Sequence, residues 1–248
     1  MVTIKRPEEI ARMREAGRIL ASVLDVFQRD LRPGMTTAEL DRIAERMIAE
    51  AGAIPSFKGY RGYPASICAS INDEVVHGIP DDRSIRHGDV VSLDIGCIWQ
   101  GWHADCARTF YLGDPPPTVD ALIRDTQRAM EAGIAAARPG NRVGDIGAAI
   151  EAVARERGYG VVRQFVGHGI GAAMHEEPQV PNYGEPGRGL RIEPGMCFAI
   201  EPMFNLGGDA VDVLDDGWTV VTRDGTLSAH FENTIAVTEN APQLLTAP

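Results

Sequence analysis

The sequence predicts a duplicated α+β fold, with antiparallel strands of both halves in one sheet and helices packed outside it. Two internal matches predict the duplication. Residues 32–52 align with residues 138–158 at an offset of 106, and residues 87–94 align with residues 194–201 at an offset of 107. In both halves the order is helix, helix and then strands. Because this period is far longer than that of a solenoid repeat, a duplicated domain is the simpler interpretation.

Length and composition are those of an ordinary globular domain. The chain has 248 residues, 44% of them hydrophobic and 24% charged, and a formal net charge of −11. We expect a single domain over residues 1–248, with pseudo-symmetric halves of about 1–113 and 118–248 on either side of a proline-rich linker. The acidic balance argues against broad nucleic-acid binding. No apolar run approaches the roughly 20 residues of a membrane helix.

The first half begins with two expected helices. Apolar residues at helical spacing predict a helix over residues 7–30, which Pro33-Gly34 ends. Thr36 or Thr37 is the expected N-cap of a second helix, which continues to about Gly52. Short strands and loops follow as far as the next long apolar runs.

Those runs, residues 89–98 and 102–112, predict a β-hairpin that turns at Gln100-Gly101. In this register Asp94 lies opposite Ala107, and Asp105 is its diagonal neighbour about 7–8 Å away. Two carboxylates within apolar strands repel each other unless a cation lies between them, because burial of an unpaired charge is costly.

The second half repeats this plan. Residues 118–137 and 142–157 are expected helices, separated by Pro139-Gly140. Apolar strands follow in the two segments CFAIEPM, from residue 197, and SAHFENTIAV, from residue 228.

The repeat superimposes Asp94 on Glu201, so the two halves place a carboxylate at equivalent strand positions. Glu232 is a further carboxylate in an apolar strand, and His168 lies among glycines that permit close backbone approach. Four carboxylates and one imidazole suit Mn²⁺, Fe²⁺ or Co²⁺, or a less typical Zn²⁺ site. Two metal ions fit this count, with Asp105 and Glu232 placed to bridge them, and the implied chemistry is hydrolysis.

Other common chemistries lack their sequence motifs. The chain has no GxxxxGK[ST], GxSxG, HExxH or GxGxxG motif. Its four cysteines form no CxxC pair, so we expect reduced thiols and no zinc ribbon.

Six ordered stretches resemble the type I methionine aminopeptidases, which are pita-bread metallopeptidases. The stretches are residues 59–80, 89–110, 167–183, 194–203, 216–225 and 228–238. The resemblance implies the pita-bread (creatinase/aminopeptidase) fold and a single catalytic metallopeptidase domain. It also implies a methionyl aminopeptidase, a hydrolase that removes the N-terminal methionine before a small second residue through a metal-bridging water.

The resemblance also assigns roles to individual residues. It implies that two divalent metal ions (Co, Mn, Fe or Zn) are bound by Asp94, Asp105, His168, Glu201 and Glu232. His77 and His175 would contact the substrate and stabilise the tetrahedral intermediate, and Glu201 would also act as the general base. The pocket for the methionine side chain is expected at Tyr60, Tyr63, Cys68, Met174 and Trp218, where apolar and aromatic groups suit a thioether.

Departures from the family pattern leave alternatives open. Met174 stands where the family usually has Phe, and His230 where it often has Gln. Residues 93–96 and 106–110 resemble in part the Xaa-Pro peptidases, which share all five ligands. These relatives typically carry an N-terminal domain, for which we expect no room before the first helix. A metal-free binding protein on the same fold is the other alternative, although such relatives lose ligands.

The remaining histidines are expected to have lesser roles. His103 and His230 each lie two residues before a predicted ligand, and we interpret them as partners of the ligating carboxylates. His87 is expected in a solvated loop.

The expected partners are the N-termini of nascent polypeptides, with the ribosome as a candidate, and neither a membrane nor a specific nucleic acid. The N-terminal segment has no apolar signal core, so we expect a cytoplasmic protein. A monomer is the expected oligomeric state.

Overall fold

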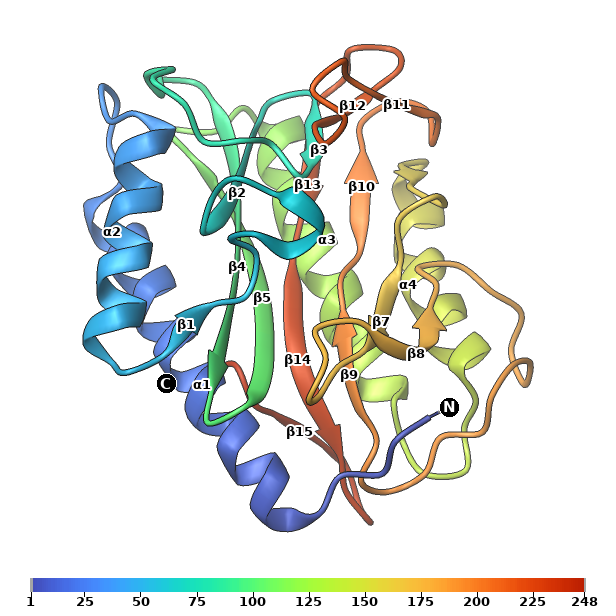
Figure 1. Cartoon of the computed structure of the whole chain (residues 1–248). Coiled ribbons are helices and arrows are strands. Elements are labelled where there is room, and N and C mark those ends of the chain that lie inside the picture. The colour runs from blue at the N-terminus through green and yellow to red at the C-terminus, as the bar shows by residue number, and fades with distance from the viewer. Residues whose placement is uncertain (1, 248) are drawn as a thin grey trace.

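Strands from distant parts of the chain alternate in one nine-stranded antiparallel sheet (Figure 1). The computed structural model describes residues 2–247. In the large sheet the order is β1–β4–β5–β14–β9–β7–β8, with β2 also paired to β4 and β15 to β14. Its strands are β1 (Ile54–Pro55), β2 (Ile67–Ile71), β4 (Val90–Trp99), β5 (Trp102–Tyr111), β7 (Gly167–Gly169), β8 (Glu176–Val180), β9 (Cys197–Ile200), β14 (Glu232–Val237) and β15 (Pro242–Leu244).

The remaining strands form two small antiparallel sheets. The sheet β13–β10–β6 consists of β6 (Gly160–Val161), β10 (Met203–Asn205) and β13 (Ser228–His230). The sheet β11–β12–β3 consists of β3 (Glu74–Val76), β11 (Val211–Val213) and β12 (Val220–Thr222). The second of these sheets joins a segment after β2 to a hairpin near the end of the chain, a pairing that no local pattern predicts.

The four long helices lie where the sequence predicts them. They are α1 (Pro7–Asp30), α2 (Thr37–Glu50), α3 (Pro117–Ala136) and α4 (Val143–Arg157), and a 3₁₀ turn covers Tyr60–Gly62. Thr36 is the N-cap of α2, where its side chain accepts a hydrogen bond from the Glu39 N–H and the Glu39 carboxylate accepts one from the Thr36 N–H. This reciprocal capping box satisfies two N–H groups that have no partner within the helix. None of the helices within residues 2–247 is both long and apolar enough to cross a membrane.

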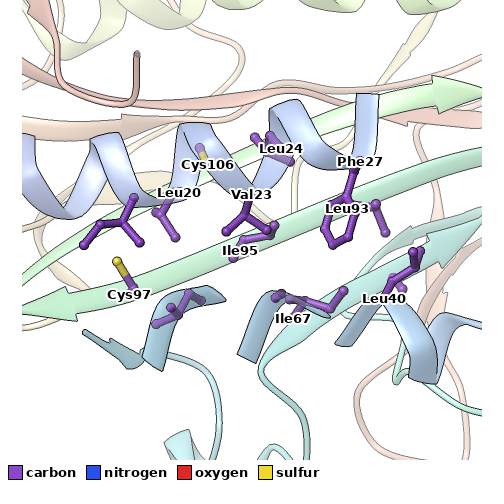
Figure 2. Packing of buried hydrophobic residues seen from close by; sticks show 14 of the residues in the cluster. Leu20, Val23, Leu24, Phe27, Leu40, Ile67, Leu93, Ile95, Cys97 and Cys106 are labelled. Carbon is purple, nitrogen blue, oxygen red and sulfur yellow. The ribbon is translucent and has the colours of Figure 1, made fainter. Parts of the chain in front are cut away.

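Each helix pair covers its own part of the sheet. One core lies between α1, α2 and strands β2, β4 and β5, and the other lies between α3, α4 and strands β8, β9, β10 and β14. Figure 2 shows the first core, where one face of α1 packs on β4 and β5. The labelled residues are Leu20, Val23, Leu24, Phe27, Leu40, Ile67, Leu93, Ile95, Cys97 and Cys106. The apolar residues at helical spacing that predict the first helix therefore form the buried face of α1.

The hairpin β4–β5 has the predicted register. Asp94 pairs with Ala107 and Asp105 pairs with Gly96, around the turn at Gln100-Gly101. The sheet continues from β5 into β14, where Glu232 also pairs with Ala107. The α+β class with one antiparallel sheet is confirmed, and the seam between β5 and β14 brings carboxylates from early and late strands together.

Gly17 of α1 shows how closely the C-terminal segment packs on this helix. A Cβ at this position would overlap the backbone carbonyl of Leu245. We expect Gly17→Ala to lower the free energy of unfolding by about 1–3 kcal/mol, although alanine favours the helix by about 1 kcal/mol. Urea unfolding measures this, with Ser22→Ala on the exposed face of α1 as the control. A stabilised Gly17→Ala protein would contradict this packing.

Candidate active site

Three adjacent strands bring the first three predicted ligands together. Asp94 of β4 and Glu232 of β14 both lie opposite Ala107 of β5, while Asp105 is two residues from Ala107 on that same strand. Side chains two residues apart on a strand share one face of the sheet, so the three carboxylates point into one region. The register of two strand pairs, rather than any loop, therefore fixes the centre of the site.

The next two strands add Glu201 and His168. Glu201 directly follows β9, and His168 of β7 pairs with Ala199 of β9. The His168 Nδ1 donates a hydrogen bond to the Gly169 carbonyl oxygen at 2.9 Å. This bond leaves Nε2 unprotonated in the neutral ring, and Nε2 lies 3.6 Å from Glu201 Oε1. We call Asp94, Asp105, Glu201 and Glu232 the carboxylate cluster.

The geometry of the carboxylate cluster and His168 fits a bound cation. Asp105, His168 and Glu232 each offer one ligand atom, and these atoms lie within 4.8 Å of one another. Three carboxylate oxygens, Asp94 Oδ1, Asp105 Oδ1 and Glu232 Oε1, are buried without a hydrogen-bond partner among residues 2–247. Unpartnered buried oxygens are costly, and a hard divalent cation satisfies them.

The protonation of the carboxylate cluster leads to the same conclusion. Burial raises the pKa of Asp94 to about 7. Burial raises the pKa values of Asp105, Glu201 and Glu232 well above their usual range, and the charges of neighbouring carboxylates raise them further. Without a cation, the four groups cannot all be ionised at neutral pH. A divalent cation reverses this effect, because its charge favours the ionised form of each ligand.

We expect the metal-free protein to lose stability as the pH rises above about 6.5. Folding raises the carboxylate pKa values, so the folded state binds more protons than the unfolded state, and stability falls as the pH rises. Five of the six histidines have a lowered pKa and give the opposite slope, but only below their unfolded pKa of about 6.5. Above that pH the carboxylate cluster sets the slope, and the four buried thiols, whose pKa values are also raised, add to it with the same sign near the unfolded cysteine pKa of about 8.5.

Urea unfolding in EDTA should therefore give a decreasing free energy of unfolding between about pH 6.5 and 8.5. The same series with saturating Mn²⁺ is the control, and we expect the decrease to be largely removed. A flat profile in EDTA would contradict the mutual repulsion of the carboxylate cluster.

His77 is held at the rim of the site in an unusual backbone conformation. It directly follows β3 and has a φ of 61°, a backbone conformation that residues other than glycine rarely adopt. Its ring packs edge-on against Phe165 at 5.4 Å and Trp218 at 6.3 Å. Burial, and secondarily the neighbouring His175, lowers the pKa of His77 to about 4. The ring is therefore neutral at physiological pH.

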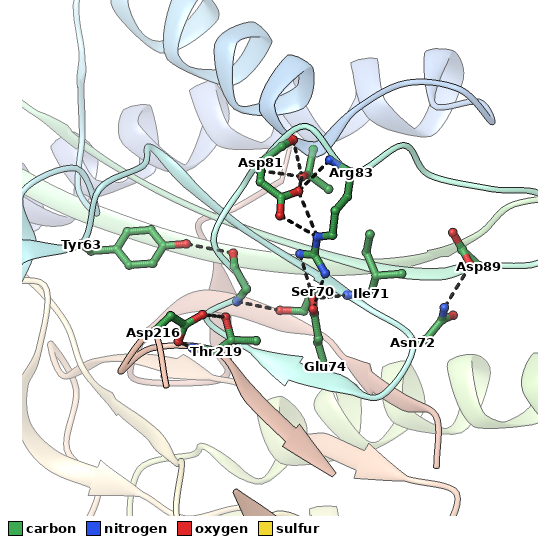
Figure 3. Close-up of polar contacts among 12 residues, drawn as sticks. Tyr63, Ser70, Ile71, Asn72, Glu74, Asp81, Arg83, Asp89, Asp216 and Thr219 are labelled. Carbon is green, nitrogen blue, oxygen red and sulfur yellow. Dashed lines mark hydrogen bonds and ion pairs between the residues drawn. The ribbon is translucent and has the colours of Figure 1, made fainter. Parts of the chain in front are cut away.

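Polar contacts on both sides fix the segment that carries His77 (Figure 3). The Tyr63 hydroxyl lies 3.0 Å from the carbonyl oxygens of Ile67 and Gly78, and the Gly78 N–H donates to Ser70 Oγ at 3.2 Å. On the other side, Glu74 forms an ion pair with Arg83. These contacts on both sides of His77 hold its backbone in the strained conformation and offset the cost of that strain.

His175 lies in the loop between β7 and β8 and lines the same cavity. Its ring centroid is 4.2 Å from that of His168, and its Nδ1 is 2.9 Å from the Tyr60 hydroxyl. Burial and the positive charge of Arg61 lower the pKa of His175. A neutral His175 ring can donate a hydrogen bond from one nitrogen and accept one at the other. It can therefore contact a polar substrate atom while it stays bonded to Tyr60.

All twelve predicted site residues line one cavity of about 370 Å³. The pocket residues Tyr63, Cys68 and Met174 are buried together with Phe57, and Trp218 packs edge-on against Tyr63 at 5.0 Å. Burial raises the pKa of the Cys68 thiol well above its usual value, so this cysteine is a neutral apolar group of the wall.

The two further histidines of the site region differ from each other. His230 lies beside Glu201, with 3.9 Å between Nε2 and Oε2, which is close but too long for a hydrogen bond. His103 instead shares a hydrogen bond with Ser56 Oγ at 2.9 Å and contacts no ligand carboxylate by hydrogen bonding within residues 2–247. The predicted role as a partner of a ligating carboxylate is thus wrong for His103, because its ring pairs with Ser56 in the loop after β1. His87 is exposed, as predicted.

Six further residues line the cavity that the sequence did not indicate. They are Phe57, Arg61, Gln164, Phe165, Val166 and Gln179. Three of them directly precede Gly167-His168, and that proximity to a predicted ligand was the only available signal. Of the others, Gln179 pairs with His168 across β7 and β8, and Phe57 and Arg61 come from the segment after β1. Their approach to the site depends on strand pairing and packing between distant parts of the chain.

Buried carboxylates and an unprotonated imidazole nitrogen, grouped in an apolar cavity and fitting a hard cation, are the features of a metal-dependent hydrolase. The chain belongs to metallopeptidase family M24, whose model matches residues 11–239. Membership of this family implies divalent metal ions.

Comparison with individual proteins gives the same family. A methionine aminopeptidase of Clostridium perfringens is 50% identical over 246 residues, which cover 99% of each chain. The crystal structure of methionine aminopeptidase from Rickettsia prowazekii has a TM-score of 0.97 and 42% sequence identity, over 99% of this chain and 100% of that chain. The prolidase from Pyrococcus furiosus has a TM-score of 0.79 at 23% identity, over 99% of this chain and 65% of that chain. This last likeness is one of fold alone. The predicted pita-bread fold is confirmed.

Proposed function

We propose that this chain is a methionyl aminopeptidase, which removes the N-terminal methionine from nascent proteins and peptides with a small second residue. The observation that carries the proposal is a full-length identity of 50% to a methionine aminopeptidase. The cavity supports it, because one apolar pocket opens directly onto a cluster of potential metal ligands. We further propose that residues 1–248 act as one catalytic domain.

Two divalent metal ions, drawn from Co, Mn, Fe and Zn, would be held by Asp94, Asp105, His168, Glu201 and Glu232. When bound, such ions polarise the scissile carbonyl and lower the pKa of a water molecule. The unpartnered oxygens of Asp94, Asp105 and Glu232 support this assignment, since three buried acceptors without donors need a cation.

Glu201 is proposed as the general base. Its carboxylate lies next to His168 and His230 and lines the cavity. With metal bound the carboxylate is ionised, and an ionised carboxylate within hydrogen-bond reach of a water molecule can accept its proton. Glu201 can then return that proton to the leaving amine.

His175 and His77 are proposed to contact the peptide. If the Tyr60 hydroxyl donates to His175 Nδ1, then Nε2 carries the proton and can donate to the oxygen of the scissile carbonyl. His77, neutral and packed against Phe165 and Trp218, is proposed to bind the peptide as well. Both roles require a fixed ring, and the contacts of each ring provide it.

The methionine side chain is proposed to occupy the apolar pocket formed by Tyr60, Tyr63, Cys68, Met174 and Trp218. A thioether packs well against aromatic edges and flexible apolar groups, and the pocket excludes water from them. Met174 contributes a second thioether to this wall in place of a rigid ring.

A competition assay tests the proposal. Metal-reconstituted protein is incubated with equal amounts of Met-Ala-Ser, Met-Lys-Ser and Ala-Pro-Ser peptides, and the products are identified by mass spectrometry. We expect methionine to be released from the first peptide alone. Cleavage of the proline peptide would instead indicate an Xaa-Pro peptidase. No cleavage with any of the four metals would favour a binding protein on the same fold.

We also propose that the single chain is the active unit and that it meets its substrates in the cytoplasm, as they leave the ribosome. The cavity supports the first point, because residues of one chain line it. Sedimentation velocity tests the oligomeric state, and co-sedimentation with ribosomes tests the second point.

A further inference from the structure

The N-terminal arm ahead of α1 contacts the loop that carries His175. Lys5 and Lys58 are the only lysines of the chain, and only Lys5 is buried. Lys5 Nζ lies 2.7 Å from Glu176 Oε2, and the two side chains are 2% and 11% exposed. Figure 1 shows the blue arm passing from α1 toward β8, which Glu176 begins. A buried ion pair thus joins residues that are 171 positions apart in the sequence.

Glu176 accepts further hydrogen bonds that fix its carboxylate. Thr3 Oγ1 donates to Oε2, and the Ala173 N–H donates to Oε1 at 3.2 Å. Burial by itself would raise the pKa of Glu176, but the bonds from Lys5, Thr3 and Ala173 lower it overall. The carboxylate is therefore ionised and ties both ends of the short segment from Ala173 to Glu176.

The Lys5 side chain also supports the loop from below. A Cβ added to Gly171 would lie 2.5 Å from Lys5 Cε and 2.7 Å from Glu176 Oε1, so the loop backbone rests directly on the ion pair. The Lys5 N–H donates to the Gly195 carbonyl oxygen at 2.8 Å, and the Gly195 N–H donates to Val237 at 2.9 Å. Lys5 is thereby fixed to the turn before β9 and to β14.

From these contacts we infer that Lys5 is a positioning residue for His175, acting through Glu176. Lys5 holds the Glu176 carboxylate, and Glu176 holds the loop through the Ala173 N–H. The loop in turn fixes the position of the His175 ring, which contacts the Tyr60 hydroxyl. This inference rests on the proposed function insofar as His175 contacts the peptide. The loop also carries Met174, so its position affects the pocket wall.

The test compares Lys5→Met and Glu176→Gln with the double variant. Methionine retains most of the length of the lysine side chain but removes its charge. We expect each single variant to lower kcat for a Met-Ala-Ser peptide by about 10–100-fold, because a small displacement of a group that contacts substrate is costly. Metal content should remain that of the wild type. The double variant should lose about as much as one single variant, since both changes break the same connection.

The control is Arg128→Met, which breaks ion pairs to the mostly buried Asp125 and to Glu156, away from the cavity. If the Lys5 ion pair only stabilised the fold, Lys5→Met and Arg128→Met would both lower the melting temperature and neither would change kcat below it. That result would overturn the inference.

A second readout does not depend on peptide hydrolysis. Side-chain ¹⁵N resonances of the six histidines are recorded with labelled protein, and His175→Ala assigns the signals of His175. We expect Lys5→Met to shift the His175 resonances and to leave those of His87 unchanged. Unchanged His175 resonances would refute the inference. If the wild type cleaves no peptide, the proposed function fails, yet these resonances still decide whether Lys5 positions His175. Should Lys5→Met not fold, Glu176→Gln gives the same comparison.

Discussion

Asp105→Asn is expected to abolish peptide hydrolysis and to remove bound metal, while making the metal-free protein more stable. Asp105 is 4% exposed, and its Oδ1 has no hydrogen-bond partner among the described residues. Its amide replacement cannot serve as an ionised ligand. We expect kcat/KM to fall by more than ~100-fold, the upper end of the cost of losing a group that only supports a ligand.

The gain in stability follows from the same burial. Without metal, Asp105 is one of four carboxylates that repel one another. Burial is the largest cause of its raised pKa, and the neighbouring carboxylates raise it further. An uncharged amide removes this unfavourable contribution. We expect the free energy of unfolding in EDTA to rise by about 1–3 kcal/mol at pH 7.5, because each unit of raised pKa corresponds to about 1.4 kcal/mol.

Metal content by inductively coupled plasma mass spectrometry, urea unfolding in EDTA and peptide turnover together check this prediction. Asp114→Asn is the control, since Asp114 is exposed in the linker before α3 and should change none of the three quantities. An unchanged metal stoichiometry in Asp105→Asn would defeat the assignment of this residue as a ligand.

His175→Ala is expected to reduce turnover heavily without loss of metal. The His175 ring lies 4.2 Å from His168 but is itself outside the carboxylate cluster, and its hydrogen bond goes to Tyr60. Removing one hydrogen-bond donor to the reacting carbonyl oxygen lowers kcat by about 10²–10³-fold. A fall in kcat with little change in KM indicates an interaction made mainly in the transition state.

The control is His87→Ala, because His87 is exposed and does not line the cavity. Steady-state kinetics with a Met-Ala-Ser peptide and metal analysis of the same preparations measure both effects. If His175→Ala lost its metal, the residue would be acting through the metal site rather than on the peptide, and its proposed role would be refuted.

Local patterns were sufficient for the helices and for one central hairpin. The helical spacing of apolar residues predicts α1, and its limits of 7–30 follow from Pro7 at the start and the break at Pro33-Gly34 after the end. The hairpin register was predictable because a tight turn at Gln100-Gly101 fixes every pair of a two-stranded ladder. Helix periodicity and turn geometry depend on neighbours in the sequence, so these features did not require the rest of the fold.

The candidate site was predictable for a different reason. Asp94 and Glu201 lie at equivalent positions of an internal repeat, and charged residues within apolar strands require a compensating partner. The resemblance to a family supplied the remaining residues. The direction of the His103 ring could not be obtained in this way, because strand alternation gives the face of the sheet but not which neighbour fills the space beside it. Ser56, from a loop 47 residues earlier, takes that place.

The sequence by itself therefore determined the helices, the fold class and twelve of the residues that line the cavity. Only the tertiary structure decided which loops close that cavity, how Phe165 and Trp218 hold the ring of His77, and that Lys5 lies beneath the loop of His175. The physical reason is that a buried polar group must find its partner in three dimensions, while sequence periodicity reports only on neighbours within a few residues.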